Sequence, residues 1–192
     1  MYAFGQFEDV AYRVFEKDCH MESFLSGMLR FGSLTYYTRT ESLVRRDSSE
    51  GVSHFLVGSV ENTGEYISSQ VYALCFHRTL ESARQSKLGK HIVEVRNPLK
   101  LAELATSKMQ SLGHDFVGGI EGVLVEYNKG EEFYSRPEQL ELARLIYSQK
   151  PRDPFELENE FRMVIISREN LGEHFELDLE SKLNFTRKIE NL

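Results

Sequence analysis

The chain has 192 residues, of which 41% are hydrophobic and 28% are charged, so it is long enough for one well-packed domain and short for two. Its formal net charge of −7 argues against broad, nonspecific binding to nucleic acid or to anionic membranes. We therefore expect a single domain over residues 1–192 whose partners are selected by a local site.

The first half of the sequence predicts strands interrupted by short helices. Strands are expected where β-branched and aromatic residues gather, at 10–15, 29–37, 52–60, 69–78 and 90–96. Between the first two of these strands, residues 16–28 fit a helix that ends near Gly27.

The clearest single element is a helix at 97–113. Asn97 suits the cap, Pro98 the first helical position and Gly113 the end. Farther along, the pattern predicts a strand at 122–127, a helix at 136–150, and sheet at 160–167 and 173–180. Strands outnumber helices in irregular order, which favours an α+β fold over a doubly wound parallel one.

The cysteines and the apolar segments bear on the compartment. Cys19 and Cys75 lie far apart and Cys75 sits in the apolar run "VYALCF", so free, buried thiols in a reducing cytoplasm are expected. The start of the chain has no basic region followed by an apolar core, and no segment approaches the roughly 18 to 20 apolar residues that span a bilayer. These features predict a soluble, unexported protein without a membrane partner.

Common catalytic motifs are missing from the sequence. It contains no GxGxxG, no GxxxxGK[ST], no CxxC, no HExxH and no GxSxG, so the usual nucleotide-fold, zinc and serine-hydrolase interpretations lose most of their weight. The six histidines show no metal-ligand spacing, and no metal site is predicted. His77 follows a predicted strand directly, where a structural role is favoured over a catalytic one.

The stretch "DPFELENEFRMVII", residues 153–166, is the most informative. Glu156, Glu158 and Glu160 alternate, which on an extended chain places all three on one face, opposite a cationic neighbour or a ligand. Arg162 lies two residues past Glu160 on that face and could neutralise the pair without any ligand. Solvated carboxylates on an edge strand are the simpler interpretation. Even with a catalytic role, Glu160 is expected to be an exposed strand carboxylate, so replacing it by Gln should hardly change folding.

Two features of the sequence resemble a known enzyme family. Glu158-Asn159-Glu160 before a strand resembles the E-x-E signature of arginine-type ADP-ribosyltransferases, and "YRVF" at 12–15 resembles their first strand, where an Arg contacts NAD. The succession "MLRFGSLTYYTRTESLVRRDSSEG", "YALCFH" and "FELENEFRMVI" also resembles uncharacterised bacterial proteins, grouped as domains of unknown function, with an ADP-ribosyltransferase-like fold. The resemblance covers roughly residues 10–170. It implies one α+β domain in which small mixed or antiparallel sheets, flanked by helices, form a cleft.

This resemblance assigns the main catalytic roles. Glu160 would be the carboxylate that stabilises positive charge on the ribose while the bond to nicotinamide breaks. Glu158 would orient the acceptor, and Arg13 would hold a phosphate or ribose of NAD with forked hydrogen bonds.

Further contacts with NAD are implied less directly. Tyr36 or Tyr37 would stack on the nicotinamide, and His77 is an additional candidate. The Ser-x-Ser part of the family pattern is not plainly present, because "FGSLT" offers only Ser33 and Thr35. Ser33 is therefore the candidate at that position, and the orientation of NAD stays open.

Two functions follow as hypotheses. The first is an NAD-dependent ADP-ribosyltransferase or NAD hydrolase, acting inside a bacterial cell or in phage defence, with a protein or nucleic acid as the acceptor. Arg13 and residues 158–160 would then lie on adjacent strands around a common cleft, with 163–166 buried beneath. The second is a catalytically silent module that binds a nucleotide, a nucleic-acid end or a protein through the arginines of 39–46, with the Glu pair locked by Arg162.

Overall fold

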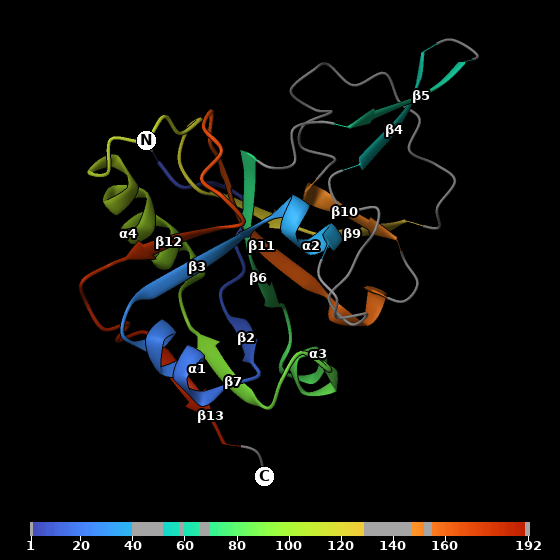
Figure 1. Cartoon of the computed structure of the whole chain (residues 1–192). Coiled ribbons are helices and arrows are strands. Elements are labelled where there is room, and N and C mark those ends of the chain that lie inside the picture. The colour runs from blue at the N-terminus through green and yellow to red at the C-terminus, as the bar shows by residue number, and fades with distance from the viewer. Residues whose placement is uncertain are drawn as a thin grey trace.

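Strands dominate the architecture of the chain (Figure 1). The structure is a computed structural model and describes residues 2–39, 52–57, 60–65, 70–128, 147–151 and 155–190. Its principal sheet has nine strands, and all their pairings are antiparallel except the one between β1 and β8. The mixed α and β composition predicted from the sequence is confirmed.

The principal sheet branches. Its members are β1 (Phe4–Gly5), β2 (Ala11–Phe15), β3 (Met28–Ser33), β6 (Val71–His77), β7 (His91–Val95), β8 (Glu121–Leu124), β11 (Glu160–Ile166), β12 (His174–Asp178) and β13 (Thr186–Ile189). The main path runs β1-β8-β11-β6-β2-β7-β13, while β12 joins through β3, which also pairs with β6. The small sheets that were expected to form a cleft are therefore branches of one sheet.

Two strand pairs lie outside that sheet. β4 (Val52–Val57) pairs with β5 (Val60–Glu65) in antiparallel fashion. β9 (Glu126–Asn128) pairs with β10 (Gln149–Pro151) in parallel. The second pair matters for the site because it delivers Lys150 to the same pocket as β11.

The helices are short apart from α4. They are α1 (Asp18–Leu25), α2 (Leu34–Arg39), α3 (Leu80–Gln85), α4 (Pro98–Gln110) and the 3-10 turn η2 (Glu156–Glu158). In α4, the Asn97 side chain accepts a hydrogen bond from the Lys100 backbone N–H at 2.9 Å, and Pro98 takes the first position, where no N–H is needed. The helix predicted at 97–113 is confirmed, although it ends at Gln110.

Several other expected elements differ from the structure, and the strand expected at 122–127 is divided between β8 and β9. The strand expected at 29–37 stops at Ser33, whose hydroxyl accepts a hydrogen bond from the Tyr36 N–H at 3.1 Å and so favours a turn into α2. The strand expected at 52–60 ends at Val57. Of the helix expected at 136–150, residues 136–146 lie outside the described residues, and 149–150 belong to β10.

The core is centred on β11 and β6, which pair over the whole length of β11. Met163, Val164 and Ile165 are each at most 1% exposed, so the burial expected for residues 163–166 is observed except at Ile166, which is half-buried. Met163 and Ile165 pack in one cluster and Val164 in another, which shows that both faces of β11 are covered. Burying each side chain of this size contributes about 1.5 to 3 kcal/mol.

On the edge of β6 away from β11, the sheet forks. Here β2 pairs with β6 only at Tyr12–His77, and β3 pairs only at Gly32–Ala73 and Ser33–Tyr72. In the described part of the chain, no strand pairs with residues 74–76 on this edge. The two branches therefore leave β6 at opposite ends, and the space between them holds the pocket described next.

Candidate functional site

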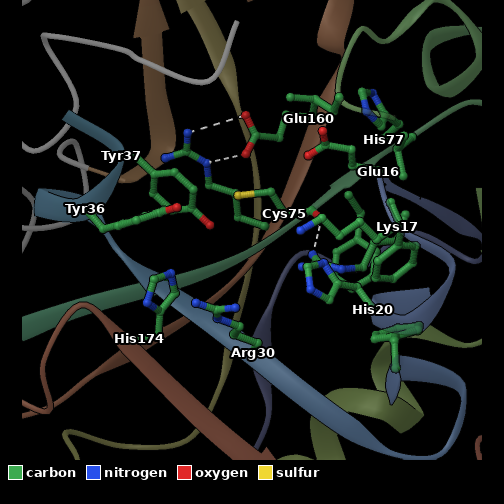
Figure 2. A pocket seen from close by; sticks show the side chains of 18 of the residues that line it. Glu16, Lys17, His20, Arg30, Tyr36, Tyr37, Cys75, His77, Glu160 and His174 are labelled. Atoms are coloured by element: carbon green, nitrogen blue, oxygen red, sulfur yellow. Dashed lines mark hydrogen bonds and ion pairs between the residues drawn. The ribbon is translucent and has the colours of Figure 1, made fainter. Parts of the chain in front are cut away.

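A pocket of about 460 Å³ opens in the fork of the sheet. That volume lies within the roughly 300–1,000 Å³ typical of small-molecule sites. Figure 2 shows Tyr36, Tyr37 and His174 on one side, Lys17 and His20 on the other, and Cys75 and Glu160 between them. The pocket thus joins an aromatic wall, a basic wall and an acidic centre.

Most of the residues singled out from the sequence line this pocket. They are Arg13, Tyr36, Tyr37, His77, Glu158 and Glu160. Ser33 does not line the pocket, because the residue is only 2% exposed and its hydroxyl accepts the hydrogen bond from the Tyr36 N–H. The expectation that Arg13 and residues 158–160 lie on adjacent strands is wrong, since β6 separates β2 from β11. Of the arginines at 39–46, Arg45 and Arg46 lie outside the described residues.

The backbone around the E-x-E is not extended, as the alternating carboxylates had suggested. Glu156 and Glu158 belong to η2, Asn159 adopts a left-handed conformation with φ 44°, and β11 begins only at Glu160. Asn is among the residues that tolerate this conformation best. The turn leaves Glu156 exposed but brings Glu158 and Glu160 to the same ammonium group.

Glu160 is held by two buried cations. Its Oε1 accepts a hydrogen bond from Arg162 Nε at 2.8 Å, and its Oε2 lies 2.8 Å from Lys150 Nζ. Burial alone would raise the pKa of Glu160, but Arg162 and Lys150 together hold that pKa well below its ordinary value. Glu160 is therefore ionised, and at 4% exposure it is not the solvated strand carboxylate of the simpler interpretation.

Glu158 behaves in the opposite way. Its pKa is raised to about 7 overall. Burial is the largest cause of the rise, the attraction of Lys150 offsets part of it, and repulsion from ionised Glu160 adds to it. Lys150 Nζ lies 2.9 Å from Glu158 Oε2. Near neutral pH Glu158 is therefore divided between protonated and ionised forms beside a carboxylate that stays ionised, and such divergent pairs are typical of acid–base chemistry.

Arg13 is held in place at the fork. Its Nη1 donates to the Cys75 carbonyl at 2.7 Å, on the part of β6 where strand pairing is interrupted. Its guanidinium carbon lies 5.3, 5.8 and 5.6 Å from the ring centroids of Phe15, Phe24 and Phe76, a spacing at which cations and aromatic rings attract. The site therefore presents this positive charge in a defined orientation.

His77 supports the turn that carries Glu158. Its Nδ1 lies 2.7 Å from the Glu158 carbonyl oxygen, which can only accept, so Nδ1 carries the hydrogen. Burial lowers the pKa of His77, and the ring is neutral with Nε2 as an acceptor. This contact gives His77 a structural role, whatever further contact it makes with a ligand.

The aromatic wall depends on a glycine. The rings of Tyr36 and His174 have centroids 4.3 Å apart, and the Tyr37 hydroxyl donates to the Ala73 carbonyl at 3.4 Å. A Cβ on Gly32 would lie 2.7 Å from the Tyr37 hydroxyl oxygen, so only glycine leaves room for this tyrosine. The rings are inclined to one another, by 60° between Tyr36 and His174 and 68° between Tyr36 and Tyr37, so any one of them could stack on a planar ligand ring.

Sequence reasoning missed two central members of the site. Cys75 lies two residues before His77 on β6, hydrogen-bonds to Glu160, and has a pKa raised by burial and by that carboxylate. The spacing of two along a strand is the signal that could have found it. Lys150 was expected in a helix, and no local pattern announces the parallel pairing of β10 with β9 that places it here. Both cysteines are free, as predicted, but Cys19 is exposed and not buried as expected.

None of the described helices combines the length and the apolar content needed to cross a membrane. Comparison with protein-family models, curated proteins and solved structures finds no match for this chain. The function is therefore argued from the pocket.

Proposed function

We propose that the protein is an NAD-dependent ADP-ribosyltransferase or NAD hydrolase, with an ADP-ribosyltransferase-like fold, that cleaves the nicotinamide glycosidic bond of NAD in this pocket. One observation carries the proposal. Arg13, Glu158 and Glu160 line a single pocket, in which the pKa of one carboxylate is lowered and that of the other is raised. The resemblance of the E-x-E and of the Arg13 strand to that enzyme family supports the same assignment.

Glu160 supplies negative charge where the reaction develops positive charge. When the glycosidic bond breaks, nicotinamide leaves with the electron pair and the ribose carbon becomes cationic, as in glycoside hydrolysis. An ionised carboxylate that is already oriented stabilises such a transition state by about 2 to 4 kcal/mol. Arg162 and Lys150 keep Glu160 ionised and immobile in readiness for that step.

Glu158 serves the second half of the reaction. Water, or a nucleophile on a protein or nucleic-acid acceptor, bonds to the ribose carbon and releases a proton. A carboxylate with a pKa of about 7 is well matched to accept that proton near neutral pH. Arg13 holds a phosphate or ribose of NAD, and Tyr36 or Tyr37 stacks on the nicotinamide. The free cysteines fit a reaction in the cytoplasm.

A second candidate is a catalytically silent module that binds a nucleotide, a nucleic acid or a protein. The observation in its favour is that Arg162 and Lys150 already satisfy Glu160, which is only 4% exposed. In that case the carboxylates organise the pocket and take no part in bond cleavage.

Nicotinamide release separates the two candidates. Purified protein is incubated with NAD and free nicotinamide is followed by chromatography, while calorimetry measures NAD binding. We expect release by the wild type and a fall of about 30-fold or more in Glu158→Gln and in Glu160→Gln, equivalent to about 2 kcal/mol. Glu103→Gln, an exposed carboxylate on α4 that does not line the pocket, is the matched control and should retain full activity.

The remaining outcomes are equally decisive. NAD binding without nicotinamide release favours the silent module. If the wild type neither binds NAD nor releases nicotinamide, NAD is not the ligand and the proposal is overturned.

A further inference from the structure

Among the residues that the structure describes, Lys150 is the one cation that contacts both Glu158 and Glu160. Its Nζ lies 2.9 Å from Glu158 Oε2 and 2.8 Å from Glu160 Oε2. The side chain is 9% exposed and its ammonium lies 4.9 Å from the centroid of the Phe155 ring, which holds it at the pocket. Lys150 is thus fixed between two groups that would otherwise repel each other.

The two carboxylates depend on Lys150 to different degrees. Glu160 has a second cation in Arg162, whose Nε and Nη2 lie 2.8 and 3.4 Å from its oxygens. For Glu158, Lys150 is the direct ion-pair partner at 2.9 Å, while Arg162 acts on it through space. Losing Lys150 therefore affects Glu158 far more than Glu160.

The other groups around Glu158 do not replace Lys150. Neutral His77 binds its backbone carbonyl, and the Tyr127 hydroxyl accepts from the Glu160 N–H. Arg78, at the end of β6, pairs with Glu8. On α3, which packs against η2, the charged residues Glu81 and Arg84 are exposed.

We propose that Lys150 is a positioning residue that keeps a working fraction of Glu158 ionised at neutral pH, so that Glu158 can accept the proton of the attacking nucleophile while Glu160 remains permanently charged. This inference rests on the proposed function and extends it to a residue outside the E-x-E pattern. The step balances: the glycosidic bond breaks with its electron pair going to nicotinamide, the nucleophile's oxygen or nitrogen bonds to the ribose carbon, and its proton moves to Glu158.

The test compares Lys150→Met, which keeps the length of the side chain and removes its charge, with Lys150→Arg, which retains the charge. Carbon-13 NMR of labelled glutamate carboxyls reports the titration of Glu158 without requiring activity. We expect a midpoint near 7 in the wild type, a rise of one pH unit or more in Lys150→Met, and recovery toward the wild-type midpoint in Lys150→Arg. The control is Lys108→Met, which removes a lysine of α4 that pairs with Glu180 and should leave the Glu158 midpoint unchanged.

The pH profile of nicotinamide release provides the functional readout. A rise of one unit leaves about one tenth of Glu158 ionised at pH 7 instead of about half, so kcat/KM at pH 7 should fall about five-fold and recover at higher pH. A purely structural role for Lys150 would lower activity at every pH without moving the profile.

The outcomes separate this inference from the proposed function. An unchanged Glu158 midpoint in Lys150→Met overturns the role of Lys150 whether or not NAD is turned over. A raised midpoint in a protein whose wild type releases no nicotinamide supports the electrostatic role and overturns the proposed reaction. If Lys150→Met does not fold, Lys150→Gln answers the same question, because it also removes the charge.

Discussion

Glu94 and Glu160 each lie between two cationic side chains, yet their surroundings differ. On β7, Glu94 accepts hydrogen bonds from Arg96 Nε at 2.7 Å and Arg187 Nη2 at 2.9 Å. The side chains of these arginines are 55% and 56% exposed. Burial raises the pKa of Glu94, but the two hydrogen bonds and the positive charges outweigh it and lower the pKa overall. The Glu94 side chain is itself only 11% exposed, but water still solvates most of each arginine, so we call this the surface cluster.

The Glu160 cluster is enclosed instead. The side chains of Arg162 and Lys150 are 1% and 9% exposed, and that of Glu160 is 5% exposed. Burying paired charges gives little net stability, because desolvation consumes much of the attraction, but removing one partner leaves an uncompensated charge. A cluster of this kind at a pocket is the arrangement expected where charge serves chemistry. The comparison predicts that similar substitutions have unequal effects at the two sites.

The largest effect is expected from Arg162→Met. It leaves Glu160 with Lys150 alone and removes the donor to the Tyr147 carbonyl, so the free energy of unfolding should fall by about 3 to 5 kcal/mol. Arg187→Met in the surface cluster is the control and should cost about 1 kcal/mol or less. Urea denaturation measures both variants. Equal losses would show that burial does not distinguish the two clusters.

Glu160→Gln should destabilise the protein by about 3 kcal/mol, since the amide still accepts one hydrogen bond but removes the buried negative charge that Arg162 and Lys150 share, with Lys150 then paired only through Glu158 among the carboxylates of the site. This replaces the expectation of unchanged folding that follows from treating Glu160 as an exposed residue. Thermal melting beside urea denaturation provides the measurement, and NAD assays on this variant must be run well below its melting temperature. A wild-type melting temperature would contradict the buried ion-pair description.

The pH dependence of stability should show opposite contributions from Glu158 and Glu160. The pKa of Glu158 rises from 4.5 to about 7 on folding, so between these pH values the folded state binds more protons than the unfolded state. The stability that Glu158 contributes therefore falls as the pH rises from 4.5 to 7, by on the order of 3 kcal/mol in total. For Glu160, the lowered pKa makes its contribution present above 4.5 and lost as the pH falls below that value.

Glu158→Gln isolates the first of these terms. The difference in unfolding free energy between wild type and Glu158→Gln should change between pH 4.5 and 7, while Glu103→Gln should track the wild type. A difference that stays constant across the window would mean that the pKa of Glu158 is not raised.

The smallest effect is expected at the surface cluster. Glu94→Gln should cost about 1 kcal/mol or less at 0.1 M salt, and the loss should shrink at 1 M salt, where the screening length falls to about 3 Å. The loss in Glu160→Gln should depend less on salt, because the side chains of Glu160, Arg162 and Lys150 are at most 9% exposed. Urea denaturation of both variants at the two salt concentrations tests this prediction. Equal salt sensitivity would show that the Glu94 and Glu160 clusters do not differ in their access to solvent.

Local pattern was enough to predict much of the fold. β-branched and aromatic runs located β2, β6, β7 and β11, and Asn97 with Pro98 located the start of α4. These signals act over a few residues, as propensity and capping do. β13, at Thr186–Ile189, was not predicted, because as a short edge strand it depends on pairing with β7.

The site divides in the same way. The sequence singled out the acidic pair, Arg13 and the tyrosines as candidates through a resemblance to NAD-using enzymes, and the structure places them around one pocket. It did not predict the burial of Glu160, the left-handed turn at Asn159 or the arrival of Lys150 on β10. Burial and pKa depend on groups distant along the chain, and only the forked sheet and the parallel β9–β10 pair bring those groups together.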